Sequence, residues 1–305
     1  MITEVNRPNF IIIGAAKAGT TALYWYLAEH PEVFMSPVKE TNWFAYGRNE
    51  RGELVYGDET LHPFPVRSER EYARLFADPG EAKAIGEASP IYLECPETPK
   101  RIANSLPEAK LICSLRNPVD RAYSDYQMYL RERGRSLDPQ RDLSADAEWM
   151  RPDSHWMRIS RYHDALLRYF ERFPRKNIHV LLFDDLRREP LGIVQDVYRF
   201  LGVDPEYAPD FDTPHNVGGM PENPFLERLF TQASAVRSAV EPWLPKLATK
   251  WLRRVRARNM RKAPTLPESL RARMVGHFDD DIAKTARLIG RDLDAWRQPR
   301  PAKVG

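Results

Sequence analysis

Short apolar runs alternate along the chain with stretches of helical periodicity. Residues 10–13 are four consecutive apolar residues, a pattern typical of a strand buried at the centre of a parallel sheet. Further strands are predicted at 83–87, 110–115 and 178–183. Because strands and helical stretches follow each other in turn, the pattern predicts an α/β fold with a central parallel sheet flanked by helices.

Apolar residues recur at helical spacing between these strands. They predict helices at 20–30, 99–105, 120–133 and 159–173, and a helix through 193–201 that ends at Gly202. A final amphipathic helix is indicated by an apolar residue at every fourth position, namely Leu270, Met274, Phe278 and Ile282.

The segment 203–267 differs from the rest of the chain because it contains nine prolines. We expect it to be a long excursion that carries one or two helices. Residues 297–305 are expected to be a frayed tail. Since no repeat, low-complexity tract or linker divides the chain, residues 1–305 are predicted to form a single domain.

Composition and charge exclude several classes of protein. The 305 residues include 46 Lys and Arg against 43 Asp and Glu, and this balance argues against a nucleic-acid partner. The hydrophobic share of 42% excludes a disordered chain. Two cysteines are too few for a disulfide scaffold, and the histidine spacings suggest no metal site. No apolar run is long enough to span a membrane or to serve as a signal peptide, so a cytoplasmic location is expected.

The stretch between the first strand and the first helix has the chemistry of a phosphate cradle. In residues 14–21 (GAAKAGTT), small residues let backbone N–H groups approach an anion, and the helix N-terminus adds positive potential. Lys17 adds a formal charge, while Thr20 and Thr21 add hydroxyl donors and are candidate helix caps. The loop is similar to a Walker A sequence, except that Thr20 stands where the Walker lysine would be. The alternative is a simple turn with an incidental lysine.

Two motifs together resemble the sulfotransferase family, whose members use 3′-phosphoadenosine 5′-phosphosulfate (PAPS). The first is similar to the family's 5′-phosphosulfate loop, and the resemblance assigns to it Lys17, Ala18, Gly19, Thr20 and Thr21. Residues 114–126 (SLRNPVDRAYSDY) are similar to its 3′-phosphate motif, which assigns that phosphate to Arg116 and Ser124. The motif style is nearest to bacterial and heparan-sulfate-type carbohydrate sulfotransferases. The resemblance implies a P-loop-like fold, PAPS as co-substrate, 3′,5′-ADP as product and no required metal.

The chemistry of the second motif agrees with this interpretation. Arg116 follows a predicted strand, and ligands of open α/β sheets bind at the carboxyl ends of strands. A guanidinium can grip a phosphate with two hydrogen bonds, and Ser124 can add a hydroxyl donor. The alternative is a solvated arginine ahead of a proline-initiated helix.

Residues 39–44 (KETNWF) resemble the Glu-x-His-Phe-Phe segment of the heparan-sulfate-type enzymes. The resemblance makes Glu40 the general base, and Lys17 would stabilise the charge on the leaving oxygen. Asn42 stands in place of the family's histidine. The alternative for Glu40 is a surface carboxylate paired with Lys39.

Residues 87–90 (EASP) are the nearest local equivalent of a Glu-Lys-Thr/Ser-Pro segment found in the carbohydrate enzymes. Ala88 replaces the lysine, which puts acceptor contacts at that point in doubt. Glu87 and Ser89 remain candidate site residues.

Residues 246–262 contain eight basic residues and no acidic one. Three interpretations stay open: a solvated helix face, a surface for an acidic acceptor or a membrane, and a basic loop over PAPS. The third rests on a resemblance by position, which assigns Arg261 and Lys262 to the cofactor. The family's loop usually contains Lys-Gly-Arg, whereas residues 260–262 (MRK) lack the glycine.

The sequence thus predicts a PAPS-dependent sulfotransferase that acts on a hydroxyl or amine of a small-molecule, glycan or lipid acceptor. Segment 203–267 would form the acceptor cleft or a lid. One alternative is a P-loop kinase or NTPase, in which residues 181–185 (LLFDD) would be a Walker B strand with a magnesium carboxylate. The other is a module that binds polyanions or a membrane surface through residues 246–262.

Overall fold

The computed structural model describes residues 7–48, 54–55, 66, 68–212, 220–221, 260–261 and 264–298. The chain divides into two compact units. The first comprises residues 1–117, 162–215 and 284–291, and the second comprises residues 118–161, 216–283 and 292–305. The single domain expected over residues 1–305 stays a prediction.

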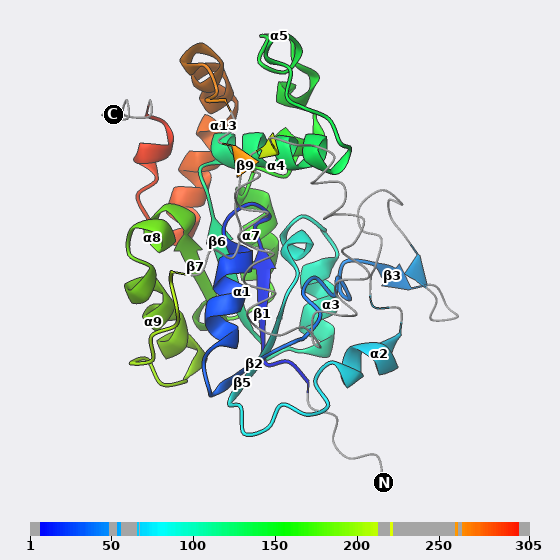
Figure 1. Ribbon diagram of the computed structural model, residues 1–305. Helices are drawn as coiled ribbons and strands as arrows, with labels where there is room; N and C mark the ends of the chain where they lie inside the picture. The colour runs from blue at the N-terminus through cyan, green and yellow to red at the C-terminus, as the bar shows by residue number, and fades with distance from the viewer. Residues whose placement is uncertain are drawn as a thin grey trace. The chain divides into compact units, whose positions relative to one another are not determined.

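The first unit is built on a five-stranded parallel sheet with the order β2-β5-β1-β6-β7 (Figure 1). The strands are β1 (Phe10–Gly14), β2 (Val33–Met35), β5 (Ala84–Ala88), β6 (Lys110–Leu115) and β7 (Ile178–Leu182). The central strand β1 is wholly buried, as its continuous apolar run predicts. The chain leaves β1 toward β2 on one side and later crosses to β6 on the other. The carboxyl end of β1 is therefore a switch point, where ligands of open α/β sheets bind.

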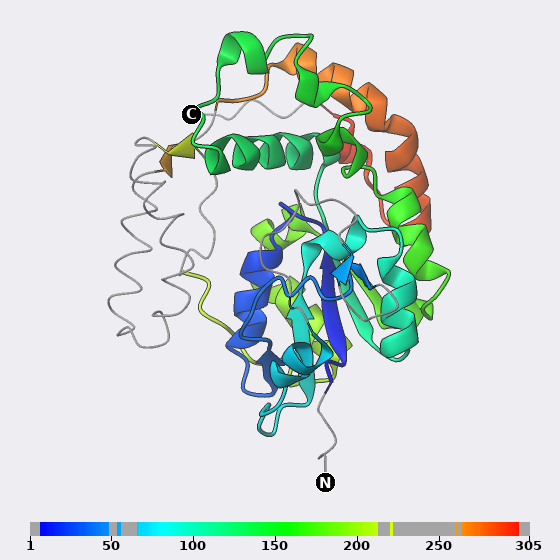
Figure 2. The same cartoon turned by 90° about the vertical axis from the view of Figure 1, so that its right-hand side faces the viewer.

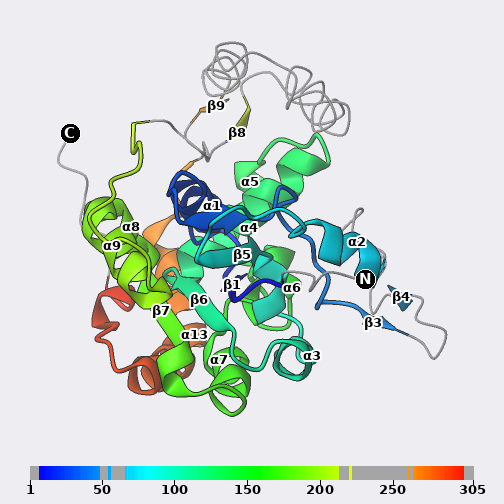
Figure 3. The ribbon, with the colours of Figure 1, turned by 90° about the horizontal axis from the view of Figure 1, so that it is seen from below.

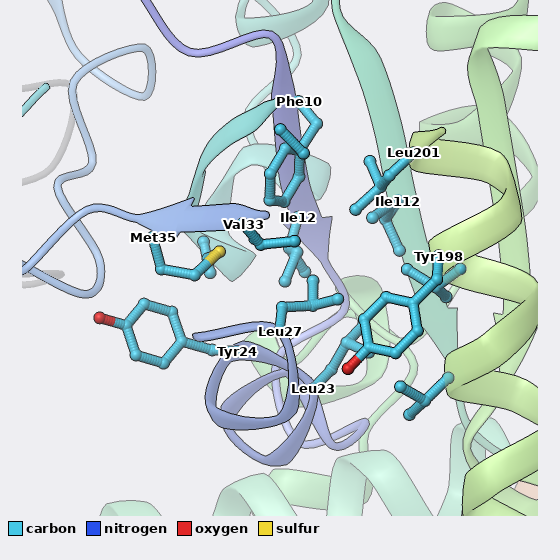
Figure 4. Close-up of a cluster of buried hydrophobic side chains, with 14 of the residues drawn as sticks. Phe10, Ile12, Leu23, Tyr24, Leu27, Val33, Met35, Ile112, Tyr198 and Leu201 are labelled. Atoms are coloured by element: carbon cyan, nitrogen blue, oxygen red, sulfur yellow. The ribbon is translucent and has the colours of Figure 1, made fainter. Parts of the chain in front are cut away.

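Helices cover both faces of this sheet, as Figures 2 and 3 show. On one face lie α1 (Thr20–Ala28), α8 (Phe183–Arg188) and α9 (Pro190–Leu201), and on the other lie α3 (Thr98–Ser105) and α7 (His163–Phe170). In the core of the first face, Leu23 and Leu27 of α1 meet Ile12 of β1 (Figure 4). The α/β fold predicted from the sequence, with its parallel sheet between helices, is confirmed.

Smaller elements complete the first unit. They are the 3₁₀ turns η1 (Pro90–Leu93) and η3 (Arg175–Asn177), the helix α2 (Glu69–Arg74), and an antiparallel pair of β3 (Gly47–Arg48) and β4 (Leu54–Val55). Both cysteines, Cys95 and Cys113, are free.

In the second unit, the long helix α4 (Pro118–Glu132) carries an aromatic cluster. Trp149 stacks on Tyr126, with ring centroids 5.0 Å apart and planes 10° apart, and Tyr123 packs on the same indole. The other elements within the described residues of this unit are α5 (Pro139–Asp142), η2 (Glu148–Met150), α6 (His155–Arg158), the antiparallel pair β8 (Met220–Pro221) and β9 (Met260–Arg261), and η5 (Asp294–Trp296). The helix α13 (Glu268–Ile289) begins in this unit and ends in the first.

The helix predicted over 159–173 is shorter than expected. It begins at His163, because the preceding residues close a separate turn, α6. The buried Ser160 hydroxyl donates to the Trp156 carbonyl, 2.7 Å away, and so competes with helical hydrogen bonding at this point.

Several predictions fall wholly or partly outside the described residues. Of the proline-rich segment 203–267, the structure describes 203–212, 220–221, 260–261 and 264–267, and of the tail 297–305 only Arg297 and Gln298. Among the residues that are described, no helix is both long and apolar enough to cross a membrane.

We predict that Gly86→Ala destabilises the sheet. A Cβ at Gly86 would lie 2.3 Å from the Phe10 ring, which is itself completely buried in β1. Because the ring has no room to move, the free energy of unfolding should fall by about 1–3 kcal/mol, as measured by urea unfolding.

The matched control is Gly276→Ala on the exposed side of α13, where a Cβ meets no atom within 4 Å. A helical alanine there should raise the free energy of unfolding by up to about 1 kcal/mol. Equal stabilities of the two variants would contradict the packing argument.

Candidate functional site

The predicted phosphate loop is the turn from β1 to α1, and two glycines allow it to be this tight. Gly14 and Gly19 have positive φ values of 150° and 84°. A Cβ at Gly14 would lie 2.8 Å from the Cβ of Leu93, and one at Gly19 would lie 2.7 Å from the Phe183 ring. The glycines are therefore required by packing around the loop, a reason that the sequence pattern does not reveal.

The start of α1 differs from the prediction in one respect. Gly19 is the N-cap residue, no side chain caps the helix, and Thr20 is buried. Thr20 and Thr21 are therefore not the caps that the sequence suggested, because both already lie inside the helix. The Leu23 N–H donates to the Gly19 carbonyl at 3.0 Å, which starts the helical hydrogen bonding. The first turn contains no acidic residue. The N-terminus of α1 thus keeps the positive potential that favours an anion.

The end of β6 holds this loop in place. The Ala15 N–H donates to the Ser114 carbonyl at 2.7 Å, and the Ser114 hydroxyl donates to the Ala18 carbonyl at 2.6 Å. One N–H of the Arg116 guanidinium donates to the Lys17 carbonyl at 2.9 Å. The two predicted phosphate motifs are thus directly hydrogen-bonded to each other. Sequence reasoning missed the role of Ser114, although this residue opens the second motif.

Arg116 is fixed by two further contacts within the first unit. Its guanidinium carbon lies 5.0 Å from the centroid of the Phe183 ring, a cation–π distance, and its carbonyl accepts a hydrogen bond from the Tyr162 hydroxyl at 2.8 Å. The same ring fills the space beside Gly19. Phe183 therefore positions both the loop and the arginine.

The stretch at 181–185 does not form the Walker B site of the alternative interpretation. The strand β7 ends at Leu182, and the two aspartates that follow lie in the first turn of α8. Asp184 is exposed, whereas Asp185 accepts from Arg188 at 2.5 Å and from Arg291 at 2.7 Å. A carboxylate held by two guanidinium groups is poorly disposed to bind magnesium. The described part of the chain contains no cluster of His, Cys, Asp and Glu that could hold a metal ion.

Glu40 lies at the same edge of the sheet as the loop. Its N–H donates to the Ala88 carbonyl at 2.9 Å, and Ala88 is the register partner of Ile12 in β1. The Glu40 side chain is 40% exposed and forms an ion pair with Lys39. The predicted surface pair with Lys39 is thus present, and the Glu40 carboxylate is accessible at this edge of the sheet, while its role as general base stays a prediction.

The backbone around Glu40 is unusual. Glu40 and Asn42 have φ values of 63° and 54°, in the left-handed region that non-glycine residues rarely adopt. Asn42 is buried, and its N–H donates to the Ser89 hydroxyl at 3.1 Å. Its side-chain oxygen has no hydrogen-bond partner among the residues that the structure describes. Asn42 therefore places an unsatisfied acceptor where the resembled motif has a histidine.

Glu87 is a completely buried carboxylate next to this segment. One of its oxygens accepts from Thr41 at 2.5 Å and from Ser89 at 2.8 Å, and the other from Tyr72 at 2.8 Å and from Tyr92 at 2.9 Å. Burial raises the pKa of the Glu87 carboxyl, while these four hydrogen bonds act in the opposite direction. We call these four hydroxyl groups and Glu87 the hydroxyl cage.

The aromatic residues that follow are part of the same packing. The Trp43 ring stacks on Tyr72 with centroids 5.1 Å apart, and Phe44 is buried against Tyr72 and Tyr92. Phe44 is thus a core residue.

The remaining predicted cofactor residues belong to the second unit. Ser124 lies on α4, and Arg261 is an exposed residue of β9. Lys262 lies outside the described residues, as do residues 246–259.

Comparisons with known proteins agree on one family. A family model described as "Sulfotransferase family" matches residues 8–207. The bifunctional heparan sulfate N-deacetylase/N-sulfotransferase 3 of Homo sapiens is 26% identical over 97% of this chain, and the corresponding enzyme 4 of Mus musculus is 27% identical over 97%. The chain spans about a third of the length of these curated relatives, 32% in each case.

A solved structure gives the same result over nearly all of this chain and all of the other. The crystal structure of a sulfotransferase from Alicyclobacillus acidocaldarius has a TM-score of 0.69 and 30% sequence identity. The match covers 96% of this chain and 100% of that one.

The burial of Glu87 in the hydroxyl cage predicts that the stability of the protein depends on pH. Because folding raises the pKa of Glu87, the folded state binds the proton more tightly than the unfolded state, whose pKa is near the ordinary value of 4.5. This contribution to stability is therefore complete below the unfolded pKa and is lost as the pH rises through the folded pKa. Glu87→Gln removes the titrating group. As the pH falls from about 8 to about 5, the melting temperature of the wild type should rise relative to that of Glu87→Gln.

Glu171→Gln is the matched control, because Glu171 is 57% exposed and lies beyond the end of α7. Its melting temperature should follow that of the wild type across the same pH range. A constant difference between the wild type and Glu87→Gln would contradict the raised pKa of Glu87.

Proposed function

The chain belongs to the sulfotransferase family, and from this premise we propose that it transfers the sulfuryl group of PAPS to an acceptor hydroxyl or amine. The observation that carries the proposal is the position of Glu40. The Glu40 N–H is bonded to the end of β5, beside the strand that leads into the phosphate loop, and its carboxylate is accessible.

The residues of the loop fit the anionic end of PAPS. The start of α1 offers backbone N–H groups with no acidic residue nearby in its first turn, and Lys17 adds a positive charge. Residues 17–21 would hold the 5′-phosphosulfate, and Arg116 with Ser124 would hold the 3′-phosphate. Arg261 and Lys262 are further candidates for the cofactor. This donor set of ammonium, guanidinium, hydroxyl and backbone N–H groups suits phosphate without a metal ion.

The chain's own groups would then divide the chemistry between them. Bound PAPS supplies a sulfuryl group, which bonds to the acceptor atom as its bond to the 5′-phosphate oxygen breaks, leaving 3′,5′-ADP. Glu40 takes the proton from the acceptor hydroxyl or amine as that bond forms. Lys17 stabilises the charge that grows on the departing phosphate oxygen. The contact from Arg116 to the Lys17 carbonyl keeps the loop in one conformation during this step.

For the acceptor we propose a glycan that offers an amine or a hydroxyl. The support is the match of nearly the whole chain to enzymes described as heparan sulfate N-sulfotransferases. N-deacetylated, unsulfated heparosan presents both groups on one polymer and is therefore a suitable probe. Analysis of the sulfated product distinguishes transfer to nitrogen from transfer to oxygen.

We predict that 3′,5′-ADP stabilises the protein without magnesium. At about 100 times its dissociation constant, a ligand specific for the folded state adds about 2.7 kcal/mol, which should raise the melting temperature by about 5 °C. Lys17→Ala should remove most of this shift, because a charged partner of the phosphate is lost. Stabilisation by ATP only, and only with magnesium, would support the kinase alternative instead.

We predict that Glu40→Gln lowers kcat for transfer from PAPS to the heparosan probe by about 10²–10⁴-fold, the range for loss of a general base. The shift in melting temperature with 3′,5′-ADP should stay at its wild-type value, because Glu40 does not contact the nucleotide in this scheme. Glu171→Gln makes the same chemical change at an exposed position and should retain full activity. Full turnover in Glu40→Gln would refute the assignment of the base.

A further inference from the structure

The segment that carries Glu40 is fixed to the end of β5 at three consecutive residues. The Glu40 N–H donates to the Ala88 carbonyl, the Thr41 hydroxyl to the Glu87 carboxylate, and the Asn42 N–H to the Ser89 hydroxyl. These hydrogen bonds measure 2.9 Å, 2.5 Å and 3.1 Å. Residues 40–42 are thus matched, one to one, with residues 87–89.

This attachment holds a backbone that would not adopt its conformation alone. Glu40 and Asn42, on either side of Thr41, both lie in the left-handed region. Such a conformation is unfavourable for a residue other than glycine and persists only where the surrounding structure fixes it. Since the direction of the Glu40 side chain follows from this backbone, the contacts with residues 87–89 also determine where the carboxylate lies.

Glu87 sets the direction of the hydrogen bonds in this attachment. While Glu87 is ionised it has no hydrogen to give, so each hydroxyl of the cage then donates its own hydrogen to Glu87. The hydroxyl oxygens are then left to accept. Ser89 accepts from the Asn42 N–H, and Tyr92 accepts from the Phe44 N–H at 3.3 Å. Burial also raises the pKa of Tyr72 and Tyr92 well above the ordinary value, so both remain hydroxyl donors.

We propose that Glu87 is a positioning residue for the general base: through the Thr41, Ser89 and Tyr92 hydroxyls it fixes the backbone of residues 40–44 and thereby aims Glu40 at the acceptor. The inference rests on the proposed function for the role of Glu40. It assigns Glu87 no contact with substrate or cofactor, because the carboxylate is completely buried and all its hydrogen bonds are internal.

Glu87→Gln tests the inference with almost no change in shape. The amide nitrogen is a donor, so two of the four hydroxyls must reverse and accept from it. Their own hydrogens then lack the acceptor that Glu87 supplied. A hydroxyl oxygen that accepts from the amide is also less available to accept from the backbone N–H groups of the segment. We expect kcat with the heparosan probe to fall by about 100-fold, as for a misplacement of about 1 Å, with an unchanged affinity for 3′,5′-ADP.

Two further variants, one control and one second test, separate positioning from a general loss of stability. Tyr72→Phe removes one donor to the same carboxylate but keeps the ring that stacks on Trp43, and no hydrogen bond of Tyr72 reaches residues 40–44 among those observed. It should lower the melting temperature and leave kcat within a few-fold of wild type. Thr41→Val removes the donor that belongs to the base segment itself, and it should reproduce the fall in kcat even if Glu87→Gln folds poorly.

A double variant shows whether Glu87 acts through Glu40. If it does, Glu87→Gln should cause no further loss of kcat in a Glu40→Gln background, because the group that it aims is already inactive. Independent losses that multiply would overturn the inference. A parallel fall in the affinity for 3′,5′-ADP would also overturn it, since that result indicates a general structural role.

Backbone amide exchange gives a readout that requires no activity. In Glu87→Gln the N–H groups of Asn42 and Phe44 should exchange at least about tenfold faster, while those of the buried strand β1 keep their wild-type rates. Unchanged exchange at both positions overturns the inference, whatever the activity. Absence of 3′,5′-ADP binding by the wild type would instead overturn the proposed function, so the two failures are distinguishable.

Discussion

The pairing of β1 with β6 is the interaction on which the rest of the site depends. The register of this pair shifts between Ile12 and Gly14, so that Ile13 is an extra residue in β1 and the chain turns as it leaves the sheet. Immediately after this bulge, the Ala15 N–H bonds to the Ser114 carbonyl. The pairing thus continues into the loop itself, and it sets where the loop lies relative to Arg116.

An apolar ring supports the charged part of the site. Phe183 fills the space that a side chain at Gly19 would need, and the Arg116 guanidinium lies over its face. The guanidinium is thereby held by the Lys17 carbonyl and by this ring. An aromatic face orients a cation while leaving most of its positive charge uncompensated. Such a support suits a residue that has to attract an anion.

The sequence was sufficient for the main elements of the fold, because continuous apolar runs mark buried parallel strands such as β1 and β6. It was not sufficient for β2, which has only three residues and lies between Pro31 and Pro37. Resemblance supplied the residue types of the site, but not the left-handed conformation of Glu40 or the internal bonding of Glu87. Thr41 and Glu87 are 46 positions apart, so no local pattern records their contact. The available signal was an acidic residue at the end of an otherwise apolar strand.

The buried carboxylate of Glu87 also bears on how the protein acquires its structure. Its four donors come from the base segment, from α2, from the end of β5 and from η1, which are brought together only in the folded chain. Any partly assembled form would bury this carboxyl group with too few hydrogen bonds, which is energetically costly. We therefore expect these four segments to assemble together rather than one by one. The requirement that completes the site would then also make this part of the fold cooperative.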